Sequence, residues 1–229
     1  MSRLRPFAAV VFDMDGTLLD TELVFKDVVW RVTGGLGFTM TDALHGQIVG
    51  SSHETTRRLL AEAFGSTFPY VLFDEQCRAL MLARMEEAVP IKAGVPELLK
   101  ELKARRIPMA VATSSRAAHA LSHLGAAGLL DHFAAIVTRD DVTQPKPHPE
   151  PYLTAVSQLG VLPARAIAIE DSASGIRSAH SAGLQTVLVP DLVPPTTETR
   201  KLASAVFDDL HALRTAMFAA VDRDLVSGT

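Results

Sequence analysis

The chain has 229 residues, of which 48% are hydrophobic and 21% are charged, and its formal net charge is −4. These values are ordinary for a globular protein, and the acidic balance argues against a protein that binds nucleic-acid backbones, which is normally basic. The single cysteine, Cys77, excludes an internal disulfide and fits a reducing compartment. No apolar run reaches the ~20 residues that a membrane-spanning helix needs. We therefore expect a cytoplasmic protein without a membrane or nucleic-acid partner.

The first predicted element is a buried strand over Phe7–Phe12, which is short, continuous and rich in β-branched and aromatic residues. It leads directly to Asp13 and Asp15, followed by Gly16 and Thr17. Two carboxylates close together repel each other unless a cation lies between them. Because carboxylate oxygens suit a hard cation such as Mg²⁺, this segment predicts a metal site at the carboxyl end of a strand, where open α/β sheets place their active sites.

From Glu22 to about Glu87 the sequence carries helical patterns and no convincing strand. The patterns predict helices over Glu22–Thr33, from the capping-box motif Ser51-x-x-Glu54 onward, and over Asp74–Glu87.

After Gly94 the pattern changes to alternating strands and helices. The predicted strands are Pro108–Ala112, Ala135–Thr138, Ala166–Ile169 and Gln185–Val189. The predicted helices are Val95–Arg105, Arg116–His123, Glu150–Leu159 and Ser174–Ala182. This alternation predicts an α/β fold with a Rossmann-like parallel sheet and helices on both of its faces. We place the core domain at residues 1–20 and 91–229, and an inserted all-helical cap domain at residues 21–90.

Four segments that follow predicted strands carry polar residues suited to chemistry. They are Asp13 with Asp15, Thr113 with Ser114, the loop that contains Lys146, and Glu170 with Asp171. Because the carboxyl ends of parallel strands lie at one edge of a sheet, we expect these side chains to converge on one crevice.

The order of these motifs resembles that of the haloacid dehalogenase superfamily. The resemblance rests on Asp13-Met14-Asp15-Gly16-Thr17-Leu18, Val111-Ala112-Thr113-Ser114, Lys146-Pro147, and Ile169-Glu170-Asp171-Ser172 with Gly175. It favours the branch with a small helical cap, which includes proteins similar to β-phosphoglucomutase and to phosphoglycolate phosphatase.

The resemblance implies roles for the acidic residues. Asp13 would be the nucleophile that forms an aspartyl-phosphate, and Asp15 would protonate the leaving oxygen and later deprotonate the attacking water. Mg²⁺ would bind Asp13, the main-chain carbonyl of Asp15, and Asp171. Glu170 would be a fourth metal ligand, either directly or through water.

The resemblance also implies a phosphate site. Thr113 would donate hydroxyl and backbone N–H hydrogen bonds to the phosphoryl oxygens, and Ser114 lies near a helix start, where free N–H groups favour anions. Lys146 would pair with Asp13 and the phosphate, which lowers the Coulomb cost of bringing two anions together.

Gly50 and His53, in the predicted cap, are candidate substrate contacts. In mutase-like relatives the position that matches His53 is typically an arginine, which binds a second phosphate bidentately. A histidine there disfavours a mutase, although Arg57 or Arg58 can take the place of that arginine.

The sequence thus predicts a monomeric, Mg²⁺-dependent phosphatase that acts on a small phosphorylated metabolite such as a sugar phosphate. Dehalogenases lack the second aspartate, so the presence of Asp15 argues against that reaction. Two alternatives stay open: a phosphosugar mutase, and a regulatory protein that binds metal and phosphate without turnover.

Overall fold

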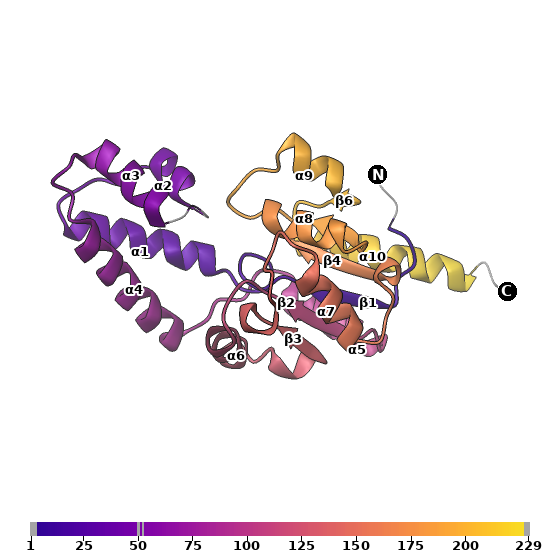
Figure 1. Cartoon of the computed structure of the whole chain (residues 1–229). Coiled ribbons are helices and arrows are strands. Elements are labelled where there is room, and N and C mark those ends of the chain that lie inside the picture. Colours follow the sequence, from indigo (N-terminus) through magenta and orange to yellow (C-terminus); the bar gives the residue numbers. More distant parts are fainter. Residues whose placement is uncertain (1–3, 50, 52, 227–229) are drawn as a thin grey trace. The chain divides into compact units, whose positions relative to one another are not determined.

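The computed structural model describes residues 4–49, 51 and 53–226 (Figure 1). The chain divides into two compact units. The core unit contains the residues up to Asp20 and from Pro90 onward, and the helical unit is Thr21–Val89.

The core unit is built on a six-stranded sheet with the order β3-β2-β1-β4-β5-β6 within the described residues. Its strands are β1 (Ala9–Phe12), β2 (Met109–Ala112), β3 (Ala135–Val137), β4 (Ala166–Glu170), β5 (Gln185–Leu188) and β6 (Ala205–Val206). Every pairing in this sheet is parallel. The predicted α/β class with a parallel sheet is confirmed.

Helices follow the strands as the alternating pattern predicts (Figure 1). They are α5 (Val95–Ala104), α6 (Ala117–Ala126), α7 (Glu150–Gln158), α8 (Ala173–Ser181), α9 (Thr197–Leu202) and α10 (Leu210–Val226). Short 3₁₀ turns lie at Leu130–His132, Arg139–Asp141 and Pro163–Arg165.

All four residues of β1 are fully buried, which shows that both faces of the sheet are covered at this strand. Ala9 and Val11 pack in one cluster with Ala155 of α7 and Ala179 of α8. Successive side chains of a strand point to opposite faces, so the neighbouring residues of β1 are buried on the other face. The central strand is therefore apolar throughout, and its first polar side chain comes after its end.

β1 lies between β2 and β4, with Phe12 paired with Val111 on one side and with Ile169 on the other. The next two strands in the chain, β2 and β3, extend the sheet on one side of β1. The later strands β4, β5 and β6 extend it on the other side. The carboxyl ends of β1 and β4 thus form the topological switch point, where α/β sheets bind ligands.

The helical unit contains α1 (Thr21–Gly35), α2 (Asp42–Ile48), α3 (His53–Phe64) and α4 (Tyr70–Glu87). It has its own core of aliphatic and aromatic side chains, which includes Val28, Leu60 and Phe68. Cys77 is a free thiol and is buried in this core. None of the helices in the described part of the chain is long and apolar enough to cross a bilayer.

Some helix bounds differ from the predicted ones. Helix α2 was not predicted separately, because seven residues give a weak periodic signal; the Thr41 hydroxyl caps it by accepting from the Leu44 N–H at 3.2 Å. Helix α4 begins at Tyr70 rather than at Asp74, directly after Pro69.

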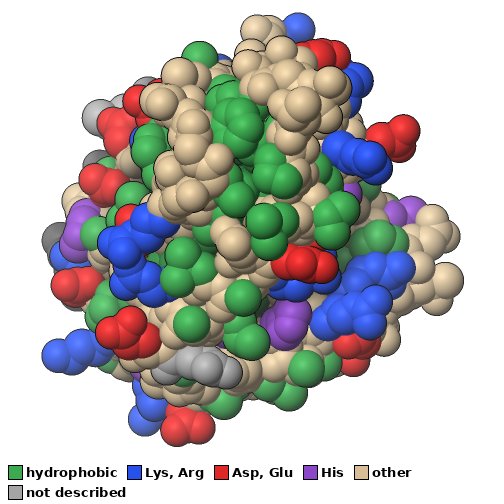
Figure 2. All heavy atoms as spheres, turned by 90° about the vertical axis from the view of Figure 1, so that its left-hand side faces the viewer, with side chains coloured by type: hydrophobic (Ala, Val, Ile, Leu, Met, Phe, Trp, Pro, Cys, Tyr) green, Lys and Arg blue, Asp and Glu red, His purple; other side chains and the backbone are tan. Residues whose placement is uncertain are grey.

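The helical unit also exposes large apolar side chains, namely Leu23, Val71, Leu72 and Leu82. Figure 2 turns the left-hand side of Figure 1 toward the viewer and shows hydrophobic side chains among charged ones on that face. Scattered exposed apolar residues are normal in globular proteins, so these residues do not by themselves identify a site.

Candidate active site

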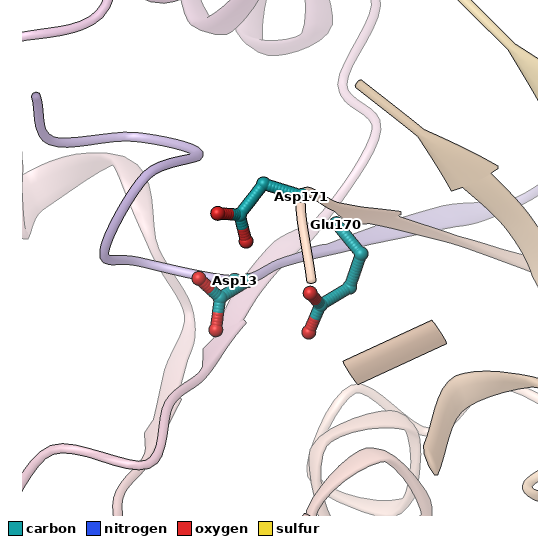
Figure 3. Close-up of side chains that lie close together, drawn as sticks. All are labelled: Asp13, Glu170 and Asp171. Atoms are coloured by element: carbon teal, nitrogen blue, oxygen red, sulfur yellow. The ribbon is translucent and has the colours of Figure 1, made fainter. Parts of the chain in front are cut away.

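Three carboxylates meet at the switch point between β1 and β4. Asp13 follows β1, Glu170 ends β4, and Asp171 comes next, so that their side chains point toward one another (Figure 3). One oxygen of each lies within 4.8 Å of the others. Glu170 is completely buried and Asp13 is 8% exposed. Three negative groups at this spacing, largely out of water, require positive charge close by.

Lys146 supplies part of that charge. Its Nζ lies 2.5 Å from Asp13 Oδ1 and 2.6 Å from Glu170 Oε1, and its side chain is 3% exposed. Burial opposes the charge of the ammonium, but the two carboxylates outweigh burial and raise the pKa of Lys146 above its ordinary value. The lysine therefore stays charged and links the ends of two neighbouring strands.

One ammonium does not balance three carboxylates. Burial raises the pKa of Asp13 to about 8, although Lys146 acts in the opposite direction and Glu170 adds repulsion. A hard cation beside Asp13 and Asp171 would favour the ionised form of Asp13. The carboxylate oxygens of Asp13 and Asp171 are the kind of donor that Mg²⁺ prefers, so this cluster fits Mg²⁺.

Glu170 is held by protein donors at both of its oxygens. Oε1 accepts from Lys146 and from the Tyr152 hydroxyl at 2.7 Å, and Oε2 accepts from the Ser172 N–H at 3.2 Å and the Ser172 hydroxyl at 2.9 Å. A carboxylate has about four lone-pair sites, so these donors occupy all of them. Burial and the charge of Glu170 raise the pKa of Tyr152 well above its ordinary value, which keeps the hydroxyl protonated as a donor.

Asp15 lies two residues after Asp13, in a tight loop. The N–H groups of Leu18 and Leu19 both donate to the Met14 carbonyl, at 2.9 and 3.0 Å. The Ser115 hydroxyl donates to Asp15 Oδ2 at 2.8 Å, which fixes the orientation of this carboxylate from the segment that follows β2. The structure thus brings together Asp13, Asp15, Lys146 and the end of β4, as the predicted convergence requires.

The predicted phosphate contacts are met only in part. The backbone N–H of Thr113 donates to the Val137 carbonyl at 2.9 Å, so the prediction that this N–H binds a phosphoryl oxygen is wrong. Its hydroxyl oxygen accepts from the Ser115 N–H at 3.0 Å, which leaves the hydroxyl proton available to a ligand. Ser114 is exposed, and α6 begins three residues later at Ala117.

The predicted substrate contacts lie in the helical unit. His53 is exposed in the first turn of α3, and its Nδ1 is 3.4 Å from the Tyr70 hydroxyl and 3.4 Å from Asp74 Oδ1. Gly50 lies outside the described residues. The role of both residues stays a prediction.

Sequence reasoning missed Ser115 and Tyr152. Ser115 directly follows the predicted pair Thr113 and Ser114, so a longer motif would have included it. Tyr152 is fully buried, and the signal was a phenol within the apolar face of α7, because a buried tyrosine hydroxyl needs a hydrogen-bond partner.

Comparisons with known proteins agree with this geometry. A model of haloacid dehalogenase-like hydrolases matches residues 10–189. The chain is 34% identical over 179 residues to a phosphorylated carbohydrates phosphatase of Thermotoga maritima, covering 78% of this chain and 83% of that protein. It is 31% identical over 182 residues to a fructose-1-phosphate phosphatase of Escherichia coli, covering 79% and 95%. A Thermotoga maritima crystal structure, provisionally described as a β-phosphoglucomutase, matches with a TM-score of 0.77 at 31% identity, covering 90% and 97%.

Gly175 tests how tightly the site is packed. A Cβ at this position would lie 1.7 Å from Glu170 Oε1, so Gly175→Ala must displace the carboxylate that holds Lys146. We expect the free energy of unfolding to fall by about 2 kcal/mol or more, as overpacking of a core typically costs. Urea denaturation measures it.

Gly46→Ala is the matched control, because Gly46 is a helical glycine whose added Cβ would meet nothing within 4 Å. This variant should be neutral or gain up to about 1 kcal/mol from helix propensity. Equal stability of the two variants would contradict the packing argument.

Proposed function

Because the chain belongs to the haloacid dehalogenase-like hydrolase family and its named relatives include phosphatases, we propose that it hydrolyses a small phosphorylated metabolite with Mg²⁺, through an aspartyl-phosphate on Asp13. The observation that carries the proposal is the buried Asp13 carboxylate, which lies 2.5 Å from the Lys146 ammonium at the end of the central strand. The names of the two phosphatase relatives support a sugar phosphate as substrate.

Asp13 attacks the phosphorus, so that an Asp13 oxygen–phosphorus bond forms while the bond to the leaving oxygen breaks. Asp15 gives that oxygen its proton. Water then attacks the phosphorus, Asp15 takes the proton of the water, and the carboxylate of Asp13 is released. The Lys146 ammonium and the Thr113 hydroxyl stabilise the negative phosphoryl oxygens in both steps.

The carboxylates of Asp13 and Asp171 and the main-chain carbonyl of Asp15 would hold Mg²⁺. When bound, Mg²⁺ supplies positive charge that offsets the repulsion between the phosphoryl oxygens and the attacking carboxylate. Glu170 would have no lone pair free for this ion or for one of its waters, since its four lone-pair sites already accept from Lys146, Tyr152 and Ser172. Its main part is to hold the ammonium of Lys146 beside Asp13.

In this proposal the helical unit is the cap, and it contacts the part of the substrate that leaves with the oxygen. A phosphosugar mutase is the second candidate, favoured by the structural match to the protein described provisionally as β-phosphoglucomutase. A catalytic amount of a sugar bisphosphate separates the two. A mutase would convert a sugar 1-phosphate to the 6-phosphate without net release of inorganic phosphate, whereas a phosphatase releases it.

Removal of the nucleophile tests the proposal directly. Asp13→Asn should lower phosphate release from p-nitrophenyl phosphate and from a panel of sugar phosphates by about 10³-fold or more, because an amide cannot form the acyl phosphate. In the unaltered protein, rapid acid quench should trap phosphate on Asp13.

Asp208→Asn makes the same change of charge at an exposed position of the core unit and should leave turnover unchanged. Full activity of Asp13→Asn would rule out the mechanism, and a protein that traps no phosphate on Asp13 would fit the non-catalytic alternative.

Asp15→Asn tests the proton transfer separately from the attack. p-Nitrophenolate leaves without a proton, so this variant should still release nitrophenol in a burst and then stall, since water attack lacks its base. With a sugar phosphate, whose leaving oxygen needs a proton, even the first turnover should slow by about 10²- to 10⁴-fold, because a general acid usually contributes that much to the rate. Stopped-flow and quench measurements give both rates, and an equal loss for the two substrates would argue against Asp15 as the acid.

Mg²⁺ binding should depend on pH through Asp13. Because burial raises the pKa of Asp13 to about 8, the metal-free carboxyl carries a proton below that pH, and Mg²⁺ must displace it. Affinity should therefore rise about tenfold per pH unit below about pH 8 and level off above it. Calorimetry in buffers of different ionisation enthalpy counts the released proton, and an affinity that stays constant from about pH 6 to pH 8 would contradict this coupling.

A further inference from the structure

One carboxylate oxygen of Asp191 is buried and accepts no hydrogen bond from the part of the chain that the structure describes. Asp191 lies shortly after β5, and its Oδ1 accepts from Lys92 Nζ at 2.5 Å. Its Oδ2 is buried and has no hydrogen-bond partner within the described residues, and the side chain as a whole is 12% exposed. A buried, unpaired oxygen of an ionised group is unfavourable and calls for an explanation, such as a bound water or ion.

The position of this oxygen indicates which donor it meets. A Cβ on Gly16 would lie 2.3 Å from Asp171 Oδ2 and 3.5 Å from Asp191 Oδ2. The two carboxylates therefore approach the same side of Gly16, the residue that follows Asp15. Gly16 has a φ of +82°, and its lack of a side chain is what permits this approach.

Asp191 lies beside the carboxylate site but is not part of its inner group. The three residues whose oxygens lie within 4.8 Å of one another are Asp13, Glu170 and Asp171. Asp191 thus lies beyond the residues that would bind a cation directly. From there it would contact a water molecule bound to the cation rather than the cation itself. Mg²⁺ keeps several of its waters when proteins bind it, and such waters need acceptors.

Lys92 fixes Asp191 in this position. Lys92 also lies 3.6 Å from Asp20 Oδ1, and its backbone N–H donates to the Leu18 carbonyl at 3.0 Å. The Asp20 N–H in turn donates to the Pro90 carbonyl at 2.9 Å. Lys92 therefore lies in the segment through which the chain re-enters the core unit, and both its backbone and its ammonium contact the segment through which the chain leaves it.

We propose that Asp191 is a positioning residue whose Oδ2 accepts a hydrogen bond from a water of the cation held by Asp13 and Asp171. The inference rests on the proposed Mg²⁺ site. Outer partners of this kind orient the ligands and tune the affinity of a metal site. Lys92 acts through Asp191, because it keeps Oδ1 occupied and leaves Oδ2 directed toward the water.

Mg²⁺ titration of the substrate-free protein tests the inference without relying on turnover. Asn at position 191 has a single carbonyl oxygen, which can accept from Lys92 or from the water but not fully serve both. Asp191→Asn should therefore raise the dissociation constant for Mg²⁺ by about 10- to 100-fold, the usual effect of losing an outer partner. Isothermal calorimetry and the Mg²⁺ dependence of the melting temperature both measure it.

Asp208→Asn is the control for charge, since it removes one negative charge from an exposed position. Its affinity for Mg²⁺ should be unchanged. Lys92→Met should weaken Mg²⁺ binding in the same direction, and the double variant should bind no more weakly than Asp191→Asn alone. Additive losses would contradict action through Asp191, and Lys92→Met also keeps the inference testable if Asp191→Asn does not fold.

The outcomes separate the two proposals. If the unaltered protein binds Mg²⁺ and a folded Asp191→Asn binds it equally well, Asp191 has only a structural role and the inference is wrong, while the proposed function stands. If the unaltered protein does not bind Mg²⁺, the metal part of the proposed function fails, and the inference fails with it.

Discussion

The contact between the Lys146 ammonium and the carboxylates of Asp13 and Glu170 is the interaction on which the rest of the site depends. Without it, the ends of two neighbouring strands would bring buried like charges together, which is strongly unfavourable. The surrounding residues keep this ion pair in one geometry. Tyr152 and Ser172 saturate the oxygens of Glu170, and Gly175 leaves room for its carboxylate. A buried ion pair adds little net stability to a fold. The hydrogen bonds around Glu170 and Lys146 are therefore better explained by the fixed position that they give to the Asp13 carboxylate.

That position follows from the topology of the sheet. β1 is central and apolar on both faces, so it is rigid, and the first residue beyond it enters the crevice at the switch point. The N–H of Asp13 donates to the Ile169 carbonyl at 2.9 Å, which continues the parallel pairing past the end of the strand. The tight loop after it then turns back, with Gly16 as the one residue whose missing side chain lets Asp171 approach. The sheet thus determines where the carboxylate lies, and the loops determine what surrounds it.

Sequence patterns predicted the parts of this arrangement that are local. Apolar runs that end in polar residues predicted β1, β2 and β4. Lys146 has no such local pattern and was identified through the resemblance to the family motifs. Contacts that depend on which strands are neighbours were not predictable in this way. The Thr113 N–H donates to the Val137 carbonyl because β2 pairs with β3, and no pattern around Thr113 reveals that partner. The same holds for Asp191 and Lys92, which lie 99 residues apart in the chain.

The core unit contains every residue that the proposed phosphoryl transfer uses, and these residues would contact the phosphoryl group and the leaving oxygen but not the rest of the substrate. Asp13, Lys146 and Thr113 would contact only the phosphoryl group, which is the same in all phosphate monoesters. Selection among substrates must therefore come from other side chains. The helical unit has a separate hydrophobic core, so its polar surface, including His53 and Tyr70, can change without disturbing the carboxylates. In the proposed function, this separation lets the polar surface of the helical unit vary from one relative to another while the residues that transfer the phosphoryl group stay the same.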